Sequence, residues 1–208
     1  MAIVSLLQPV IHLARIGDLR PSQFTVGMEE VERKRREWRD LPRSATGEFL
    51  GAHMVPAVIG PGKRPWLVDH HHLVLALHLE GVEQVMLSVI AHLQHLSKRR
   101  FMVFLDCHNW LHPYDAKGAR RDWKDLPKHV SGLKDDPYRS LAGEVRRAGG
   151  YAKSGIPYAE FLWADYFRDR IKPHVVEEHF AKALTRGLAL AADHGARHLP
   201  GWAGPEEE

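Results

Sequence analysis

The sequence predicts an α+β fold, in which a small mixed sheet with helices is followed by a C-terminal helical extension. The first half of the 208 residues alternates extended, β-branched stretches with helical patterns, whereas the second half carries helical patterns bounded by proline and glycine. The sequence contains neither an internal repeat nor a glycine loop of the Rossmann or Walker type. We expect residues 1–98 to form the α+β domain, with an irregular segment and a helical part, residues 99–208, packed on it as one compact unit.

The N-terminal region predicts short strands followed by a surface helix. The stretch IVSLLQPVIHLARIGDLRPSQ is typical of one or two short strands that end in a turn at Gly17 and Pro21. In the charged stretch that follows, apolar residues recur at helical spacing, which predicts a helix that is entered near Thr25 and ends before Pro42. Its charges form pairs three and four residues apart, so we interpret this face as solvated.

A hairpin, a helix and a return strand are predicted next. The polar, glycine-bearing stretch RSATGEFLGAH predicts a loop, and HMVPAVIGPGKRPWLVD predicts two short strands joined by the GPGKRP turn. From Asp69 the pattern becomes helical, and Gly81 stands where a C-terminal helix glycine is expected. The β-branched stretch QVMLSVIAHL then predicts a strand.

The second half begins with an irregular stretch and ends in three predicted helices. FMVFLDCHNWLHPYDAKGARRDWKDLPKHV is aromatic, polar and without a clear period. The first helix is expected to have Asp136 as its N-cap and to stop at Gly149. PYAEFLWADYFRDRI predicts the second helix, and HVVEEHFAKALTRGLALAADHG predicts one long amphipathic helix that ends at Gly195.

Composition restricts the compartment and the class of partner. The single cysteine, Cys107, permits no intramolecular disulfide, and the opening MAIVSLLQPVIHLARIG has neither the charge pattern of a signal peptide nor an apolar run of membrane length. We therefore expect a cytoplasmic protein with no membrane partner. The formal net charge of +3 is locally balanced, which gives weak support for nucleic-acid binding, whereas 15 histidines are a compositional excess.

The most unusual motif is the histidine cluster in LVDHHHLVLALHLEGV. A strand that leads directly into a helix presents free N–H groups and the positive end of the helix dipole, which favour an anion such as phosphate. We expect Asp69 to cap this helix, and His70, His71 and His72 to occupy its first turn. An imidazole there has the chemistry of a general acid, a general base or a phosphate-binding cation.

A metal site is an alternative interpretation of the cluster. An aspartate with several imidazoles supplies suitable ligands, but adjacent helical residues point in different directions and rarely bind one ion together. At most one or two of the three histidines would share a site, with more distant partners among His53, His92, His95, His108 and His112. The sequence therefore does not identify a metal, and a divalent cation is the one cofactor that we consider.

Several segments resemble the ParB and sulfiredoxin superfamily, and specifically its divergent group of ParB-like nucleases. The resemblance covers roughly Ile11 to Ala91 and lies in DLRPSQFTVGMEEV, VPAVI and LVDHHHLVLALHLEGVEQVMLSVI. The later tract DDPYRSLAGEVRRAGGYAKSGIPYAEFLWADYF resembles the helical part of that group. The resemblance implies a small mixed sheet whose signature helix binds a phosphate group at its N-terminus.

The superfamily signature GxxRxxA is altered in this sequence. With Ala76 in the alanine position, the glycine position falls on His70 and the arginine position falls on Leu73, which cannot bind phosphate. The resemblance places Gln23 and Glu30 in the segment that faces the substrate. In relatives that phosphorylate a small molecule, an acidic residue in that segment is the base, and Glu30 is the nearest match, although it also fits a surface pair with Lys34.

Two basic residues in the second half are further candidates for substrate binding. Arg139 lies in the first turn of a predicted helix, where its charge opposes the helix dipole. This predicts a partner, either Asp135 or an anionic ligand. Lys153 follows the double glycine and reaches the same ligand through its flexible stem, or is solvated.

These observations predict an enzyme that acts on a phosphate-containing small molecule or nucleotide. The reaction would be nucleotide hydrolysis, phosphoryl transfer or phosphodiester cleavage, with His71, His72, Asp69 and Glu30 as catalytic candidates and His70, Gln23, Arg139 and Lys153 as substrate-binding candidates. One alternative is a DNA-binding or partition accessory module, although the sequence shows no helix-turn-helix pattern and no basic stripe. The other is a histidine-dependent metalloenzyme.

Overall fold

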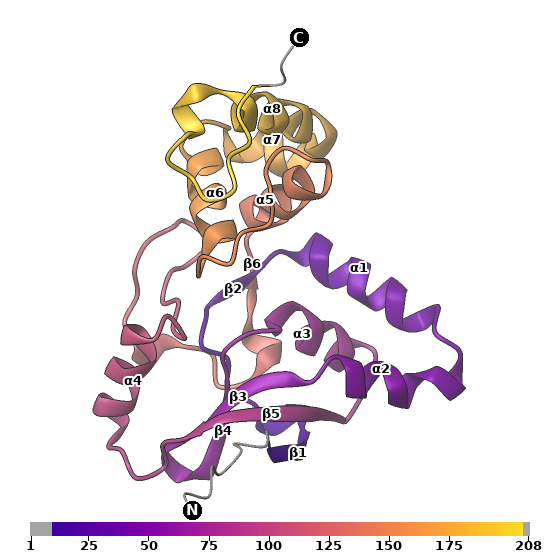
Figure 1. Ribbon diagram of the computed structural model, residues 1–208, viewed down its shortest axis with the longest axis vertical. Coiled ribbons are helices and arrows are strands. Elements are labelled where there is room, and N and C mark those ends of the chain that lie inside the picture. The colour runs from indigo at the N-terminus through magenta and orange to yellow at the C-terminus, as the bar shows by residue number, and fades with distance from the viewer. Residues whose placement is uncertain (1–9, 206–208) are drawn as a thin grey trace, which may run out of the picture.

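A computed structural model describes residues 10–205 and shows two parts. In Figure 1 a curled sheet with its helices lies below, and a group of helices from the C-terminal third lies above it. The predicted fold class, a mixed sheet with helices followed by a helical extension, is confirmed. Among the described residues, no helix is long and apolar enough to cross a membrane.

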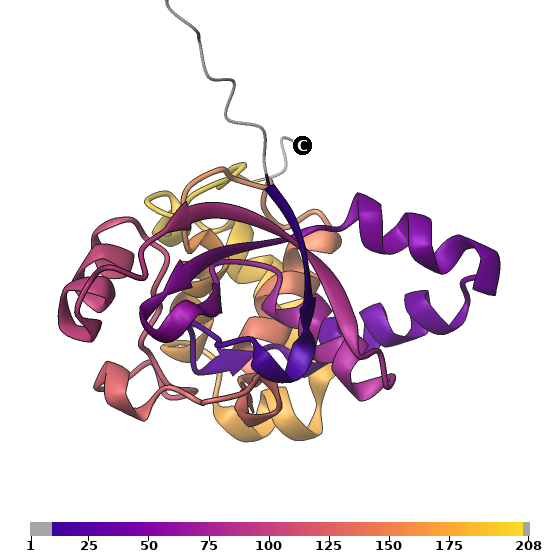
Figure 2. The same cartoon turned by 90° about the horizontal axis from the view of Figure 1, so that it is seen from below.

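The sheet has four strands in the order β1, β5, β3, β4, and Figure 2 shows how strongly it curls. Their bounds are β1 Val10–Arg15, β3 Val55–Gly60, β4 Arg64–Leu67 and β5 Gln84–His92. The outer pairs are antiparallel, while β3 runs parallel to β5. The predicted hairpin is confirmed as β3 and β4, and Gly62 in its turn has a φ of 73°, which glycine adopts without strain. The rest of the predicted N-terminal strand region, residues 3–9, lies outside the described residues.

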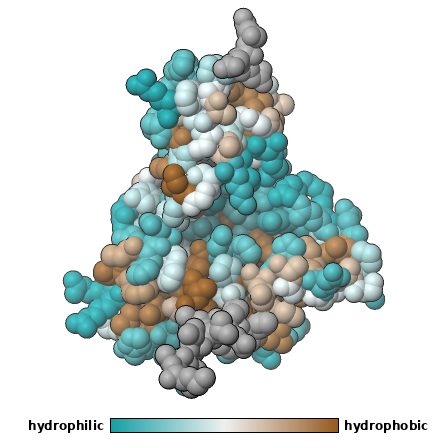
Figure 3. All heavy atoms as spheres, in the orientation of Figure 1, coloured by the Kyte–Doolittle hydropathy of each residue, from teal (hydrophilic) through white to brown (hydrophobic). Residues whose placement is uncertain are grey.

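The first three helices of the chain belong to the part that contains the sheet: α1 Met28–Arg39, α2 Thr46–Ala52 and α3 His71–Leu79. The core of this part is built around α3, whose residues 73–77 are all buried. The predicted C-terminal glycine, Gly81, has the positive φ of 76° that such a position favours. Charged side chains cover α1, and Figure 3 shows hydrophilic residues gathered there.

The loop predicted for residues 43–53 is wrong, because most of it forms α2. Its sequence, TGEFLGA, has two glycines and no capping residue that accepts a hydrogen bond. Phe49 and Leu50 nevertheless pack against the main core, and the Phe49 ring lies 5.7 Å from that of Trp38. Tertiary packing of two apolar side chains therefore stabilises a helix that local propensity disfavours.

The irregular stretch predicted from residue 101 onward begins with a helix, α4 Lys98–Cys107. Ser97 caps it by accepting a hydrogen bond from the Arg100 N–H. The buried side chains of Phe101, Met102 and Leu105 pack against the hairpin. Beyond α4 the chain does run through turns as far as β6 Lys134–Asp135, which pairs in parallel with β2 Thr25–Val26.

The C-terminal part consists of α5 Pro137–Arg147, α6 Ala159–Arg168, α7 Pro173–Glu178 and α8 Phe180–Ala192. The predicted cap is confirmed, because Asp136 Oδ1 accepts a hydrogen bond from the Tyr138 N–H at 3.1 Å. The prediction of one long final helix is wrong, since the chain breaks at His179, with φ −136° and ψ 51°. The break lets α7 and α8 turn around a second core that includes the fully buried Trp163.

Candidate functional site

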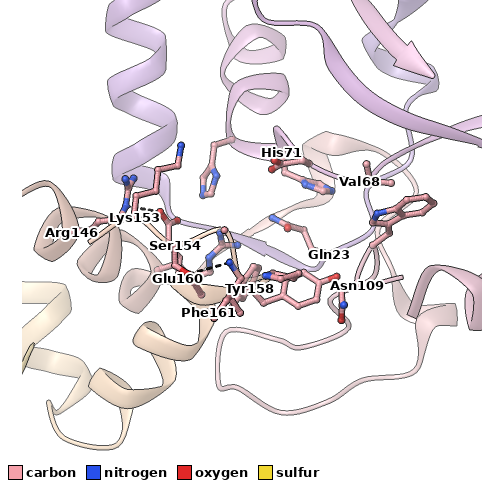
Figure 4. Close-up of a pocket in the computed structure, with 18 of the residues that line it drawn as sticks. Gln23, Val68, His71, Asn109, Arg146, Lys153, Ser154, Tyr158, Glu160 and Phe161 are labelled. Atoms are coloured by element: carbon pink, nitrogen blue, oxygen red, sulfur yellow. Dashed lines mark hydrogen bonds and ion pairs between the residues drawn. The ribbon is translucent and has the colours of Figure 1, made fainter. Parts of the chain in front are cut away.

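A cavity of about 460 Å³ lies where the start of α3 faces the helical part. It contains six of the eight residues predicted for the site: Gln23, Asp69, His71, His72, Arg139 and Lys153. The other two, His70 and Glu30, do not line it. Figure 4 shows His71 and Gln23 on one side of this cavity and Tyr158 and Phe161 on the other. The fold thus brings together residues that are more than 100 positions apart in the sequence.

The start of α3 differs from the prediction. Asp69 does not cap the helix, because its Oδ1 accepts a hydrogen bond from the adjacent His70 N–H at 2.7 Å. The N-cap position is held by His70, whose φ of 62° is left-handed and whose side chain makes no capping bond. Only His71 and His72 belong to the first turn of α3. His70 therefore has the backbone conformation that glycine adopts most easily, at the glycine position of the superfamily signature.

His71 is a buried, neutral imidazole. Its Nε2 accepts a hydrogen bond from the Ser22 backbone N–H at 3.2 Å, and the side chain is only 3% exposed. Burial, and after it the positive charge of Arg139, lowers the pKa of His71 to about 3. With Nε2 as the acceptor of the neutral ring, Nδ1 carries the proton and is a hydrogen-bond donor.

His72 repeats this arrangement one residue later. Its Nε2 accepts a hydrogen bond from the Gly27 backbone N–H at 3.0 Å. Burial, followed by the charge of Arg139, places the pKa of His72 well below its ordinary value. Both Nε2 atoms thus accept hydrogen bonds from backbone amides of the segment that leads into α1. Protonation of either Nε2 would leave the corresponding amide N–H without its acceptor.

The metal alternative has no ligand set among residues 10–205. No group of three or more histidine, cysteine, aspartate or glutamate side chains in this range is arranged to hold an ion. His53 and His108 instead stack on phenylalanine rings and bond to backbone carbonyls. The Nε2 atoms of the two α3 histidines, which would be the natural ligand atoms, already accept amide hydrogen bonds.

Arg139 is the most unusual charged residue of the cavity. Its side chain is 7% exposed, and the guanidinium lies 3.6 Å from the centre of the Phe161 ring. One N–H donates to the Thr25 carbonyl oxygen at 3.1 Å, whereas the buried Nε has no acceptor. No described carboxylate forms an ion pair with it: the predicted partner Asp135 accepts instead from the Met28 N–H at 2.9 Å, so that part of the prediction is wrong.

The rim of the cavity adds further charge. Lys153 is exposed and forms no ion pair with a described residue, while Arg146 lies 2.9 Å from a carboxylate oxygen of Glu160. Figure 4 shows Arg146 and Lys153 together at one end. Arg146 was missed from the sequence, although it follows Arg139 by seven residues and so lies on the same face of α5. Tyr158, which has a left-handed φ of 62°, carried no recognisable sequence signal.

Glu30 lies outside the cavity, on α1, in a network of cations. It pairs with Arg33 and Arg147 at 2.5 and 2.6 Å and with Lys34 at 3.5 Å. Burial alone would raise the pKa of Glu30, but Arg33 and then Lys34 hold it at about 2. A carboxylate held in this way is a weak base. The surface pair with Lys34 that the sequence suggested is present.

Comparisons with known proteins agree with this architecture. A family model described as "Putative ParB-like nuclease" matches residues 12–169. Among solved structures, the crystal structure of protein Atu1540 from Agrobacterium tumefaciens has 49% sequence identity and a TM-score of 0.89, over 96% of this chain and 100% of that one. No curated protein matches the chain. The family match includes every residue that lines the cavity at α3.

Proposed function

The chain belongs to the ParB-like nuclease family, and from this membership we propose that it is an enzyme that binds a phosphate group of its substrate in the cavity at α3. The substrate would be a nucleotide or the end of a nucleic-acid strand. The reaction would be hydrolysis of a phosphate ester or transfer of a phosphoryl group.

Arg139 is the observation that carries this proposal. A guanidinium is always charged in proteins, and a buried charge without a partner is strongly unfavourable. The ring of Phe161 and one carbonyl oxygen satisfy only part of this group, and its Nε has no acceptor. A phosphate oxygen in the cavity would supply both the acceptor and the countercharge.

The other polar residues would complete the phosphate site. Lys153 at the rim has a stem long enough to follow a ligand into the cavity. The protonated Nδ1 atoms of His71 and His72 would act as neutral donors to phosphate oxygens. In this proposal these histidines bind and position the substrate, and they do not remove a proton through Nε2, which is already occupied.

Asp69 is our candidate for the general base. It lines the cavity and forms no ion pair with a described residue, and one of its oxygens accepts the His70 N–H. The other oxygen would take the proton from an attacking water or hydroxyl group. We do not assign Glu30 as the general base, because it lies outside the cavity and its pKa is held at about 2.

The test compares two arginines that each stack on an aromatic ring and donate to a backbone carbonyl oxygen; Arg139 is buried and Arg170 is exposed. Arg170 stacks on Tyr166 at 3.8 Å and donates to a carbonyl oxygen at 3.1 Å, as Arg139 does on Phe161, but it does not line the cavity. Nucleoside mono- and triphosphates and short oligonucleotides would be screened by thermal shift with the wild type, Arg139→Gln and Arg170→Gln. Product release would be assayed with and without Mg²⁺ and Mn²⁺.

We expect phosphate-bearing compounds to raise the melting temperature of the wild type and of Arg170→Gln. Arg139→Gln should bind them about ten- to a hundredfold more weakly, because a hydrogen bond to a charged group is lost. Circular dichroism would show that both variants fold. The proposal fails if no phosphate compound binds the wild type, or if both variants lose affinity equally.

A further inference from the structure

A second cleft, of about 420 Å³, lies on the α/β part at the turn end of the β3–β4 hairpin. The hairpin turn, the start of α4 and the segment around residues 123–128 form its walls. Figure 1 shows α4 beside the hairpin, on the side away from α1 and α2. The cleft shares no lining residue with the cavity at α3, so it needs an explanation of its own.

The charges of this cleft all have the same sign. Its lining includes five basic residues and neither aspartate nor glutamate: Arg20, Arg64, Lys98, Lys124 and Lys128. Lys124 lies 3.7 Å from Asp122, and none of the other four forms an ion pair with a described residue. Elsewhere on this protein the arginines are commonly paired, as on α1. A cleft lined by unpaired cations attracts an anion.

Backbone hydrogen bonds hold together the two segments that carry the arginines of the cleft: Arg64 begins β4, and Arg20 lies in the segment between β1 and β2. Arg20 donates its N–H to the Pro65 carbonyl oxygen at 2.9 Å, and its own carbonyl oxygen accepts from the Leu67 N–H at 2.8 Å. These bonds fix Arg20 beside Arg64. Burial and then the charge of Arg64 lower the pKa of Arg20, which agrees with two like charges held close together.

One tryptophan ring, that of Trp123, lies beside two of these cations. The Lys98 ammonium is 5.4 Å from the centre of the Trp123 ring, and the Lys124 ammonium is 5.7 Å from it. Trp66 forms another part of the wall, and its buried indole Nε1 has no acceptor among residues 10–205. Cations can bind the phosphates of a polynucleotide, and an aromatic ring beside them can stack on one of its bases.

We propose that this cleft binds a single-stranded polynucleotide. Phosphates would contact Arg20, Arg64 and Lys128, and one base would stack on Trp123. A double helix does not fit this description, because its bases are stacked on one another and offer no free face to an indole ring. The inference goes beyond the proposed function, since it concerns a different site and holds whether or not the cavity at α3 binds phosphate.

The test measures the binding of a fluorescein-labelled oligothymidylate to the full chain by fluorescence anisotropy at several salt concentrations. The double variant Arg64→Gln/Lys128→Gln would be compared with Lys172→Gln/Lys182→Gln, in which two exposed lysines of the helical part are neutralised. Each series would be repeated in the Arg139→Gln background, which weakens the proposed phosphate site. Two further variants, Trp123→Phe and Trp123→Leu, test stacking.

We expect Arg64→Gln/Lys128→Gln to bind more weakly and to reduce the slope of log affinity against log salt by about 1.4, which corresponds to two phosphate contacts on a single strand. The control pair should keep the wild-type slope. Trp123→Leu should bind about tenfold more weakly, while Trp123→Phe should remain near wild type because it retains a ring.

Three results would overturn the inference. The first is an equal loss of affinity in both double variants, which would indicate a general effect of net charge. The second is wild-type binding by Trp123→Leu. The third is competition by polyglutamate or by duplex DNA as effective as that by the unlabelled single strand, which would point to an acidic protein or to a double helix.

Discussion

His71 and His72 use their Nε2 atoms to hold the backbone of the segment before α1, so both contribute to folding as neutral rings. An unfolded histidine takes up a proton near pH 6.5, whereas burial lowers the pKa of folded His71 to about 3. Between these values the unfolded chain binds more protons than the folded one. The stability that depends on the neutral ring is therefore present above about pH 6.5 and is lost as the pH falls.

His71→Gln tests this effect, because the glutamine oxygen can still accept the Ser22 N–H but does not titrate. In the wild type, the shifted pKa of His71 should remove about 2 kcal/mol of unfolding free energy between pH 7 and pH 5. The variant should lose about 2 kcal/mol less over the same range, as measured by urea unfolding at both values. His174→Gln, at an exposed position of α7, is the control, and equal pH dependence in both variants would contradict the assignment.

Single residues also show how far the sequence could predict the site. Arg139 was identified because its charge opposes the dipole of α5, and this signal is local. The hydrogen bonds of His71 and His72 were not predictable, because their donors lie more than 40 positions away and belong to the backbone. The sequence indicated that the histidines matter, but their tautomer, and with it their chemistry, depends on the tertiary contact.

At the scale of elements, the residue before α3 occupies the glycine position of the superfamily signature and has a strained backbone conformation. His70 has a left-handed φ of 62°, and its ring contributes no cap to α3. A left-handed conformation costs an ordinary residue about 1–2 kcal/mol, and a β-branched residue tolerates it least. The position is therefore better suited to glycine, which is what the superfamily signature carries there.

His70→Gly should thus be neutral or stabilising by up to about 1 kcal/mol, since relief of about 1–2 kcal/mol of strain exceeds the cost of about 0.5–1 kcal/mol for the greater freedom of the unfolded chain. His70→Val should destabilise the protein by about 1–2 kcal/mol more than His70→Gly. His78→Gly provides a control in the last turn of α3, where an ordinary helical residue is replaced and glycine costs about 0.5–1 kcal/mol. If His70→Gly destabilises as much as His78→Gly, the strain argument is wrong; urea unfolding measures all three.

The elements that were predicted correctly carry their own local signals. The β3–β4 hairpin has a glycine and proline turn, and α5 begins at Asp136 and Pro137. By contrast, α2 is stabilised by Phe49 and Leu50 against the main core, and α4 by side chains packed on the hairpin. The only local signal of α4 is its N-cap at Ser97, and α2 has no side-chain cap, so neither helix carries signals at both of its ends as α5 does.

At the scale of the whole molecule, the hydrophobic clusters bear on where the two parts of the chain divide. Residues 101–133 pack with the sheet, where Phe101 meets the hairpin and Leu133 joins the main core. The helical core begins at Tyr138. We therefore propose that the division between the two parts lies near residue 136, later than the predicted division after residue 98.

The two parts meet closely at Gly27. A Cβ atom added there would lie 2.7 Å from the Ser140 backbone nitrogen, a distance that real Cβ atoms do not adopt. The same glycine donates its N–H to His72, and Ser140 follows Arg139 directly. The glycine therefore lets the start of α1 approach α5, and this approach sets the distance between the histidines and Arg139 across the cavity.

Gly27→Ala should consequently affect both stability and the site. The added methyl group would push α5 away, which typically costs about 1–3 kcal/mol in a packed region, and it would disturb the His72 hydrogen bond and the position of Arg139. In Gly27→Ala, both the unfolding free energy and the affinity for phosphate compounds should decrease. Gly51→Ala in α2, where an added Cβ meets nothing within 4 Å, should be neutral or stabilising because alanine favours a helix. Urea unfolding and ligand-induced thermal shift measured on both variants would decide the matter: wild-type ligand binding by a folded Gly27→Ala protein would show that the cavity does not depend on this contact.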